Sequence, residues 1–471
     1  MKIGLINPGN PARKILGGYN RAMEPFAPLG LAYLAAALGQ AGHEVVVHDQ
    51  FAEKIPTAVL VDRLHDERLD LIGASCLTPD APDIAELRGA LRARGVGAPF
   101  VLGNLHATLF HDKLLADGSC DYVVRGEGEQ ALVELAGRLE QRAPLADLAG
   151  VSYAGHPAAE LAAPPDLDAL PFPAWEKLAL GRYIAPPLFR TDDILLAVQT
   201  TRGCPFDCYF CCQNAMTPRV RIRKPRNVGE EIERNWRDFG VDFFWFSDAI
   251  FPLRKEYGHA VADELIRRGL PGKVRWYTEC RVDSLDEELL VHLKQAGLMM
   301  TLFGFEVGDQ AVLSRIKPGA TLEKARAAMQ MAKRAGLASL GLFIIGLPGE
   351  TEQTISRTID FALELDPDFA KFNRAIPYPG TPFYDEYKDR IHHADSYQLY
   401  NPWNAAPDGE PLFAPEGLSY RRLVALQKKA MRRFYLRPAK ALRLIFSGRI
   451  SLRHMLRGAV ALIEGLLAKA R

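Results

Sequence analysis

Three cysteines, Cys204, Cys208 and Cys211, stand in the string Thr-Arg-Gly-Cys-Pro-Phe-Asp-Cys-Tyr-Phe-Cys, directly after an apolar run at 194–198. The apolar run predicts a buried strand, so the C-x3-C-x2-C motif lies on the loop that follows it. Three thiolates on one short loop can ligate three irons of a [4Fe–4S] cubane and leave the fourth iron open to a small molecule. A structural zinc site would need a fourth Cys or His nearby, and the adjacent Cys212 cannot easily point to the same metal. The motif therefore favours an iron–sulfur cluster over zinc or unrelated cysteines.

Strand-then-helix units repeat through the region that contains the motif. The predicted strands are 195–200, 243–247, 274–279, 300–305, 339–345 and 370–374, with helices at 227–239, 285–296, 322–335 and 352–365. Two of these helices have capping residues at their starts, Asp286 and Thr321. Six βα units predict a partial (β/α)6 barrel rather than a closed eight-stranded barrel, with its chemistry at the C-terminal strand ends.

The residues before the barrel also alternate between strands and helices. The predicted strands are 2–7, 44–48, 71–75, 99–102 and 122–125, with helices at 29–41 and 82–94. This pattern predicts an α/β domain with a doubly wound parallel sheet, which binds ligands beyond the carboxyl ends of its strands. The loops expected there, 75–78, 103–108 and 126–129, are small and polar. A G-x-G-x-x-G fingerprint and a Walker A loop are both absent, which argues against a plain nucleotide-binding domain.

The cysteine motif, with the aromatic Phe210 just before Cys211, resembles that of the radical S-adenosylmethionine enzymes. The resemblance implies that the open iron binds the amino and carboxylate groups of S-adenosylmethionine. Reductive cleavage then gives methionine and a 5′-deoxyadenosyl radical. A low-potential electron donor such as flavodoxin or ferredoxin is the expected protein partner.

The N-terminal loops resemble the cobalamin-binding domain that precedes many of these barrels, through the strings 72–78, 103–108 and 126–129. Two departures stand out. Asn104 occupies a position where a second glycine usually follows, and the D-x-H-x-x-G motif that supplies a histidine below the cobalt is absent. We therefore expect cobalamin to bind without histidine coordination. The alternative is a flavodoxin-like domain that has lost its cofactor.

The resemblance also implies roles for individual residues at the strand ends. Glu306 would hold the ribose or amino group, Arg281 the carboxylate, and the Phe210 backbone the adenine amine. The turn 346–349 would pass close to the adenine, and Asp248 resembles the acidic residue of the second strand. The alternative is that Glu306 and Arg281 only pair with each other, and that His106 is a satisfied loop histidine. The implied catalytic residues are Asp248, Arg281 and Glu306; the cofactor contacts are Phe210, Arg281, Glu306, Gly346, Pro348, Gly349, Ser75, Thr78, Gly103, His106, Gly126, Glu127 and Gly128; the metal ligands are Cys204, Cys208 and Cys211; Lys317 and Tyr378 are weaker substrate-side candidates.

Most relatives of this architecture transfer a methyl group to an unactivated carbon or to phosphorus, so methylation of a small-molecule or lipid-like substrate is the expected activity. Oxidative cyclisation, as in the anaerobic cyclase of bacteriochlorophyll synthesis, is an alternative that shares the architecture. A non-enzymatic iron–sulfur sensor is a third possibility. Methylthiolation of tRNA is disfavoured, because that family has three cluster cysteines before the barrel, whereas only Cys76 and Cys120 precede it here.

Composition fits a reduced, cytoplasmic protein of several domains. Hydrophobic residues make up 48% of the chain, charged residues 24%, and the seven cysteines do not form a disulfide framework. The start of the chain has no signal-peptide pattern, and no run of about 18 apolar residues occurs. The expected domains are 1–145 (cobalamin), 146–190 (proline-rich linker), 191–388 (barrel) and 389–471 (helical basic extension).

The last part of the chain, 421–471, contains 14 Lys or Arg and a single acidic residue, Glu464, interleaved with apolar residues. A basic amphipathic stretch of this kind can lie on the anionic inner face of a membrane. The alternative is a helical extension that packs its apolar side against the barrel. Nucleic-acid binding is not expected, because no RNA-binding module follows the barrel.

Overall fold

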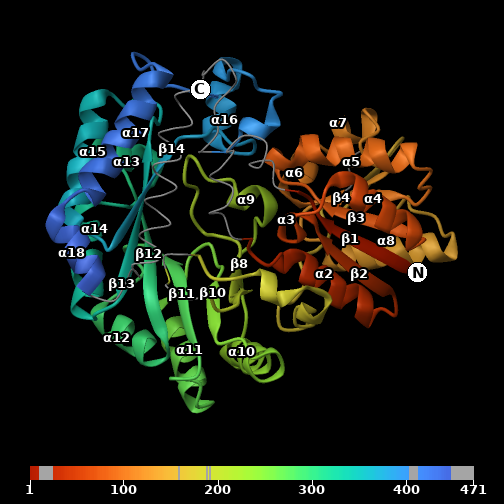
Figure 1. Cartoon of the computed structure of the whole chain (residues 1–471), viewed down its shortest axis with the longest axis horizontal. Helices are drawn as coiled ribbons and strands as arrows, with labels where there is room; N and C mark the ends of the chain where they lie inside the picture. The colour runs from red at the N-terminus through yellow and green to blue at the C-terminus, as the bar shows by residue number, and fades with distance from the viewer. Residues whose placement is uncertain (10–24, 157–159, 187–188, 190–191, 402–411, 447–471) are drawn as a thin grey trace.

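The computed structural model describes residues 1–9, 25–156, 160–186, 189, 192–401 and 412–446, and it contains two large sheets, each covered by helices (Figure 1). The first sheet has the order β2-β1-β3-β4-β5-β6, with β1–β5 parallel and β6 antiparallel to β5. Its strands are β1 (Lys2–Asn7), β2 (Glu44–Asp49), β3 (Leu71–Ser75), β4 (Phe100–Gly103), β5 (Tyr122–Val124) and β6 (Val151–Tyr153).

Helices cover both faces of this first sheet. On one face α2 (Leu29–Gln40) and α8 (Glu129–Gln141) bury Leu31 and Leu135 against Leu5. On the other face α4 (Thr57–Asp66) and α5 (Ala81–Ala93) pack against Ile72. The order 2-1-3-4-5 is that of a doubly wound domain, whose ligand site lies where the strand order reverses. The predicted fold of the N-terminal domain is confirmed.

The second sheet is parallel throughout, in the order β7-β10-β11-β12-β13-β14. Its strands are β7 (Leu195–Val198), β10 (Phe243–Phe246), β11 (Arg275–Cys280), β12 (Leu298–Glu306), β13 (Ala338–Ile345) and β14 (Phe369–Arg374); its outer helices are α10 (Pro225–Phe239), α11 (Lys255–Arg267), α12 (Glu287–Gln295), α14 (Leu322–Arg334) and α15 (Glu352–Leu365). The predicted partial barrel is confirmed. The predicted caps are confirmed too, because Asp286 accepts the N–H of Leu289 and Thr321 that of Lys324.

Two segments differ from the sequence-based expectation. The stretch expected as a loop after β4 forms the short helix α6 (Asn104–Leu109), followed by α7 (His111–Ala116). The stretch expected as linker contains β6, which extends the first sheet. The domain boundaries themselves stay predictions.

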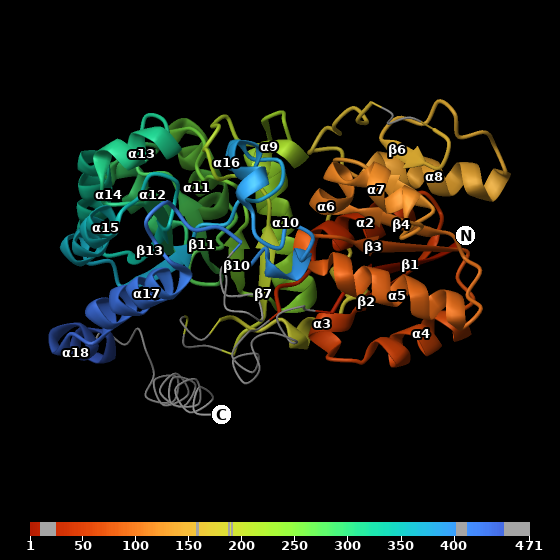
Figure 2. The ribbon, with the colours of Figure 1, turned by 90° about the horizontal axis from the view of Figure 1, so that it is seen from above.

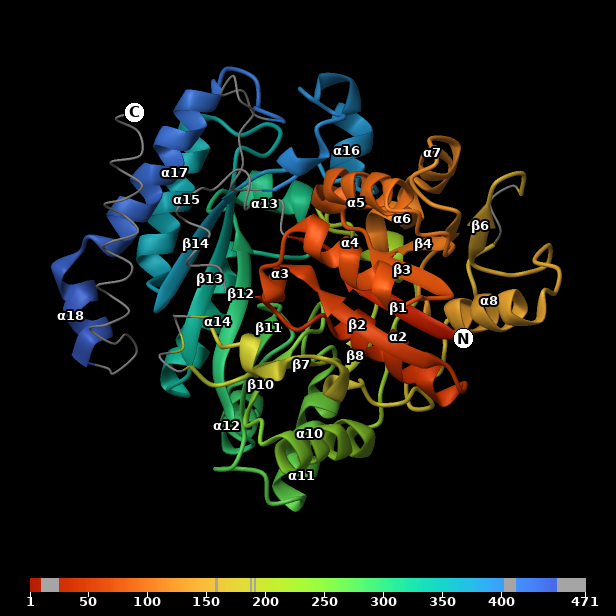
Figure 3. The ribbon, with the colours of Figure 1, turned by 45° about the vertical axis from the view of Figure 1, so that its right-hand side comes forward.

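Two helices follow the barrel and pack on it: α17 (Tyr420–Tyr435) and α18 (Pro438–Phe446). Figure 3 shows α17 lying along α15 and β14, where it buries Leu423, Leu426 and Phe434. The helical C-terminal extension is therefore confirmed for these residues; the rest of the basic tail, 447–471, lies outside the described part of the chain. None of the described helices is long and apolar enough to cross a membrane.

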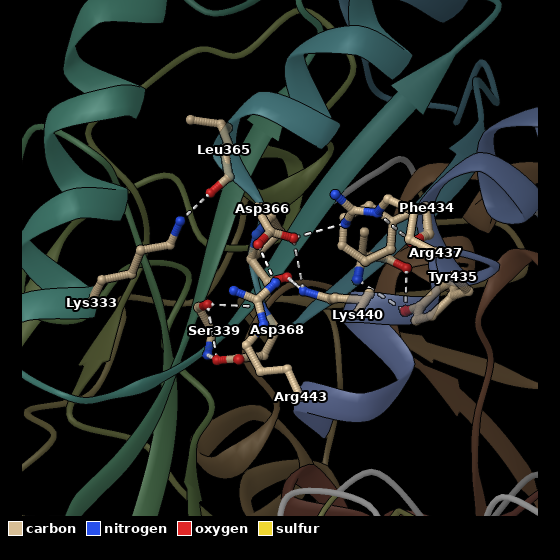
Figure 4. A network of polar contacts seen from close by, with 12 residues as sticks. Lys333, Ser339, Leu365, Asp366, Asp368, Phe434, Tyr435, Arg437, Lys440 and Arg443 are labelled. Atoms are coloured by element: carbon tan, nitrogen blue, oxygen red, sulfur yellow. Dashed lines mark hydrogen bonds and ion pairs between the residues drawn. The ribbon is translucent and has the colours of Figure 1, made fainter. Parts of the chain in front are cut away.

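One carboxylate fixes the end of this extension to the barrel (Figure 4). Asp366, just after α15, accepts hydrogen bonds from Arg437, Lys440 and Arg443. Burial alone would raise the pKa of Asp366, but the bonds and charges of Arg443 and Lys440 outweigh it and lower the pKa to about 2. Much of the positive charge of α18 is thus turned toward the protein.

Candidate cofactor-binding active site

The cysteine loop starts where β7 ends, and one buried carboxylate holds its base. Asp248, just beyond β10, accepts the backbone N–H groups of Thr200 and Thr201 at 2.7 Å each and the Thr200 hydroxyl at 2.5 Å. Burial raises the pKa of Asp248 to about 6, although these hydrogen bonds lower it. Gly203 then turns the chain at φ +85°, where an added Cβ would collide with the carbonyl of Arg219. Asp248 is therefore placed to position the loop, with both carboxylate oxygens engaged.

The three motif cysteines gather at the mouth of the barrel. Cys204 and Cys208 are partly accessible and Cys211 is exposed, all as free thiols. Cys211 is close enough to both Cys204 and Cys208 for their charges to interact. No three Cys, His, Asp or Glu side chains of the described residues converge as a single metal ion requires. Each thiolate of a cubane binds a different iron, so three thiolates on this loop fit a cluster with one open iron.

Glu306 lies next to this loop, at the end of β12, in an unusual backbone conformation. Its φ of +62° falls in the left-handed region, which costs a non-glycine residue energy. The carboxylate bends back over Gly304, where any Cβ would collide with it, and accepts a hydrogen bond from Lys317 at 2.8 Å. Its charge also interacts with Cys208. Glu306 therefore offers an acceptor beside the cysteines, with Lys317 as its partner.

Arg281, just after β11, braces the cysteine loop from the other side. Its guanidinium lies 3.8 Å from the ring centroid of Phe206, within the motif. It also donates to Asp283 at 2.7 Å and to the Pro318 carbonyl at 2.9 Å. The alternative expectation, that Glu306 and Arg281 pair with each other, is wrong, because each has its own oppositely charged partner. Whether Arg281 also contacts a carboxylate ligand stays a prediction.

The turn after β13 is held by a buried glutamate. Gly346 adopts φ +86°, and its N–H and that of Leu347 are donated to one oxygen of Glu350 at 2.7 and 2.9 Å. Burial raises the pKa of Glu350 to about 7, and its second oxygen has no hydrogen-bond partner among the described residues. Pro348 is buried and Gly349 exposed. An added Cβ on Gly346 would meet Leu423 at 3.0 Å, so packing within the protein accounts for this glycine, and the expected contact with adenine stays a prediction.

Phe210 and Tyr378 both lie near the end of the cysteine loop, since the charge of Cys212 interacts with Tyr378. Phe210 is partly accessible and packs against the cluster of buried residues around Val307 and Ile316. The neighbouring Tyr209 donates its N–H to the carbonyl of Ile316. Tyr378 follows β14, and burial raises the pKa of its hydroxyl. The Phe210 backbone is thus fixed close to Lys317.

The N-terminal loops come together at the carboxyl ends of β3, β4 and β5. Asn104 adopts φ +79°, which explains why a residue tolerant of the left-handed region replaces the usual glycine. Its side chain donates to Ser75 at 2.9 Å, and Gly126 (φ +71°) donates its N–H to Thr108 at 3.0 Å. The remaining predicted residues of these loops are the extended Gly103, the buried Thr78, and Gly128, where an added Cβ would lie 3.2 Å from Leu34.

His106 and Glu127, both predicted to contact cobalamin, contact other protein side chains. The His106 ring is 1% exposed and lies 4.6 Å from the rings of Phe110 and Tyr397, and burial lowers its pKa to about 4. Glu127 bonds to Arg202 at 2.6 Å and to Arg221, both from the short hairpin that flanks the cysteine loop. His106 is therefore covered, and Glu127 ties the two domains together.

The two sets of loops adjoin each other. Helix α6 packs against α9 (Gln213–Met216), which follows the last motif cysteine directly (Figure 1). The Thr108 hydroxyl lies 3.7 Å from the Met216 sulfur. Figure 2 shows the two sheets side by side, with α6 and α9 at their junction. A ligand of the N-terminal loops would therefore lie beside a ligand of the cysteines.

Sequence reasoning missed two charged residues of the barrel interior, Glu279 and Lys371. Their charges interact with each other, and Glu279 also interacts with Glu306. Both lie on the concave side of the sheet, a placement that strand alternation could have indicated. Cys280, one residue further on, is buried and has no place in the site.

Comparisons with known proteins agree with this geometry. Residues 198–362 match the radical SAM superfamily and residues 21–136 match the B12 binding domain. An uncharacterized methyltransferase of Pyrococcus horikoshii is 30% identical over 426 residues, covering 89% of this chain and 90% of that protein. The anaerobic magnesium-protoporphyrin IX monomethyl ester cyclase of Cereibacter sphaeroides is 30% identical over 429 residues, covering 88% and 67%. Among solved structures, the radical S-adenosylmethionine methyltransferase TsrM of Kitasatospora setae, with cobalamin and a [4Fe–4S] cluster bound, superposes with a TM-score of 0.73 at 19% identity, covering 91% and 90%. This last likeness concerns the fold.

Proposed function

The chain belongs to the radical S-adenosylmethionine enzymes that carry an N-terminal cobalamin-binding domain, and we propose that it methylates a carbon or phosphorus centre of a biosynthetic intermediate. The observation that carries the proposal is the junction of α6 with α9, which brings the cobalamin loops against the cysteine loop. A methyl carrier and a radical source must act on one substrate, so their binding sites have to adjoin. A separate sensor of iron–sulfur state would not need this arrangement.

The chain's own residues divide the work. When bound, the cluster supplies an electron for cleaving S-adenosylmethionine, and cobalamin supplies a carrier for the methyl group. Cys204, Cys208 and Cys211 would hold three irons, and Glu306, fixed by Lys317, would accept a hydrogen bond from a ribose hydroxyl or the amino group. The Gly346 turn would let the adenine approach the backbone. The remaining sequence-based assignments stay part of this proposal.

A second candidate, oxidative cyclisation, is favoured by the cyclase that matches at 30% identity. Both reactions begin with the same cleavage of S-adenosylmethionine, so the cysteine loop and its neighbours serve either. The substrate in both cases is a small or lipid-like molecule, and an electron donor such as flavodoxin or ferredoxin completes the system.

The test uses the full chain, reconstituted without oxygen with iron, sulfide and hydroxocobalamin. With a low-potential reductant and methyl-deuterated S-adenosylmethionine, we expect deuterated methyl on bound cobalamin by mass spectrometry and cleavage of the cosubstrate. Replacing Cys204, Cys208 and Cys211 together by Ala removes three iron ligands and should abolish cluster absorbance and turnover. Cys212→Ala is the matched control and should keep both. Turnover by the triple variant, or loss of the cluster in the control, contradicts the ligand assignment.

A further inference from the structure

The concave side of the second sheet keeps partly accessible side chains. In β13, Phe343 and Ile345 face the helices and are fully buried, whereas Leu340 and Leu342 face inward and are partly accessible. Glu279, Leu302 and Lys371 are likewise inward and partly accessible on β11, β12 and β14. Nearer the N-terminal end of the sheet the inward residues Phe243, Tyr277 and Met300 are buried. A closed eight-stranded barrel fills its interior with side chains. The partly accessible inward side chains here remain within reach of a ligand.

An aromatic floor closes the N-terminal end of this concave face. Phe189 packs on Phe243 and Tyr277, with ring centroids 4.9 and 4.6 Å apart. Next to it, the partly accessible Trp245 ring lies within 5° of parallel to that of Tyr277. Phe26, which is 47% exposed, adds a ring 5.4 Å from Trp245. Of these rings, Phe26, Trp245 and Phe189 present flat apolar surface to a ligand, whereas Phe243 and Tyr277 are buried.

Polar groups without protein partners lie above the floor. The indole nitrogen Nε1 of Trp245 and Oδ1 of Asn373 are buried and have no hydrogen-bond partner among the described residues. Buried polar groups nearly always form hydrogen bonds, so the N–H of Trp245 needs an acceptor and Oδ1 of Asn373 needs a donor. Trp245 and Asn373 stand on β10 and β14, toward opposite ends of the curved sheet.

Glu279 connects this surface to the cysteine loop. It follows Tyr277 by two residues on the same face, and its carboxylate makes no hydrogen bond within the described part of the chain. Its charge interacts with Glu306 on one side and Lys371 on the other. Since the two carboxylates are balanced by Lys317 and Lys371, the face carries no surplus charge that would call for an ionic ligand.

We propose that this face binds the substrate as a planar ring system laid against Trp245 and Phe26, with an uncharged edge that both accepts and donates hydrogen bonds. The acceptor of the substrate meets Trp245 Nε1, and its donor meets Glu279, which follows Tyr277 on the strand that pairs with β10. A carboxamide or a hydroxyl has the required chemistry. The inference rests on the proposed function, because Glu279 places such a molecule next to Glu306 and the cysteines.

Three small probes test the two halves of this proposal on the reconstituted full chain. 2-Naphthamide is planar and both donates and accepts; decahydronaphthalene-2-carboxamide has the same skeleton without planarity; methyl 2-naphthoate keeps the ring but has no donor. Dissociation constants come from anaerobic ligand-observed NMR. Aromatic stacking should make 2-naphthamide bind about two- to tenfold tighter than the saturated amide. The ester should bind about fivefold or more weakly, because it leaves a buried acceptor unpaired.

Variants assign each preference to a residue. Trp245→Leu should remove the preference for the planar probe, and Glu279→Leu should remove the preference for the amide over the ester. Glu287→Gln, an exposed change on α12, should alter neither preference. Cluster absorbance is measured in every sample, so that a misfolded variant is recognised.

The outcomes separate this inference from the proposed function. Absence of 2-naphthamide binding at its solubility limit, or a planar preference that survives Trp245→Leu with the cluster intact, overturns the substrate class. If the probe preferences appear as expected but S-adenosylmethionine is never cleaved, the proposed function fails and the binding surface stands.

Discussion

Glu127 was expected to contact cobalamin. Its position at the junction between the two domains predicts instead that Glu127→Ala lowers the stability of that junction. It bridges Arg202 and Arg221, while Arg202 is also held by Glu129 at 2.6 Å. The three side chains Arg202, Glu127 and Glu129 are 9%, 10% and 6% exposed. The group is therefore a buried ionic bridge between the first domain and the hairpin beside the cysteines.

The loss of unfolding free energy caused by Glu127→Ala depends on which partners Arg202 and Arg221 keep. Removing one partner of a buried ion pair costs about 3–5 kcal/mol when the remaining charge has no other partner. Here Arg202 keeps Glu129, and Arg221 is 18% exposed and keeps a hydrogen bond to the Pro165 carbonyl at 2.8 Å. We therefore expect a loss of about 2–3 kcal/mol. The control Glu134→Ala breaks a half-exposed pair with Arg138 and should cost less than about 1 kcal/mol.

Urea unfolding followed by tryptophan fluorescence measures both variants, and the earliest transition is the one compared, because two domains need not unfold in a single step. Hydroxocobalamin affinity is measured in parallel. An unfolding midpoint for Glu127→Ala equal to that of Glu134→Ala would refute the bridge. A fall in cobalamin affinity with no change in unfolding would return Glu127 to the list of cofactor contacts.

Three further predictions concern Asp248, His106 and the C-terminal tail. The pKa of Asp248 is raised from 3.8 to about 6, so the stability it contributes is full below about pH 4 and is lost as pH rises through 6. Asp248→Asn should remove about 3 kcal/mol from the change in unfolding free energy between pH 4 and 8. A pH dependence of the unfolding free energy equal to that of the wild type would contradict this. Because Tyr397 covers His106, reduced cob(II)alamin should show no hyperfine splitting from a protein imidazole nitrogen in its spin-resonance spectrum. Such splitting would show that a histidine does coordinate the cobalt. Removing residues 447–471 should abolish any low-salt binding to anionic vesicles, and persistent binding would show that this segment is not the membrane contact. Truncation after Pro415 also removes α17 and should lower the unfolding midpoint, because α17 packs on the edge of the barrel.

The strands were predictable because their apolar pattern is local. Each parallel strand is short, apolar and followed by a helical period, and the caps at Asp286 and Thr321 depend on residues three positions apart. The cysteine loop was predictable for the same reason, since its three ligands lie within eight residues. Even the replacement of glycine by Asn104 was visible as a departure, and its φ of +79° gives the physical reason.

Pairing between distant side chains was not predictable. Arg202 and Glu127 are 75 positions apart, and nothing local in either string indicates the other. The alternative in which Glu306 pairs with Arg281 is wrong, because the left-handed backbone of Glu306, two residues after Gly304, turns its carboxylate toward Lys317. A single sequence gives residue types at a site, whereas the choice among several nearby partners depends on tertiary geometry.

The segment after the barrel belongs to the cofactor-binding unit rather than to a detachable tail. Tyr397 covers His106 of the N-terminal domain, and its hydroxyl accepts a hydrogen bond from Lys113 at 3.0 Å. Leu423 of α17 lies 3.0 Å from where a Cβ on Gly346 would stand, so it backs the turn expected to meet adenine. The segment after the barrel thus packs against both expected ligand sites. Tyr397 packs against the N-terminal loops, and Leu423 packs against the turn at Gly346. Changes at Tyr397 should therefore affect cobalamin binding first, and changes at Leu423 should affect S-adenosylmethionine binding first, because each residue packs against only one of the two sites.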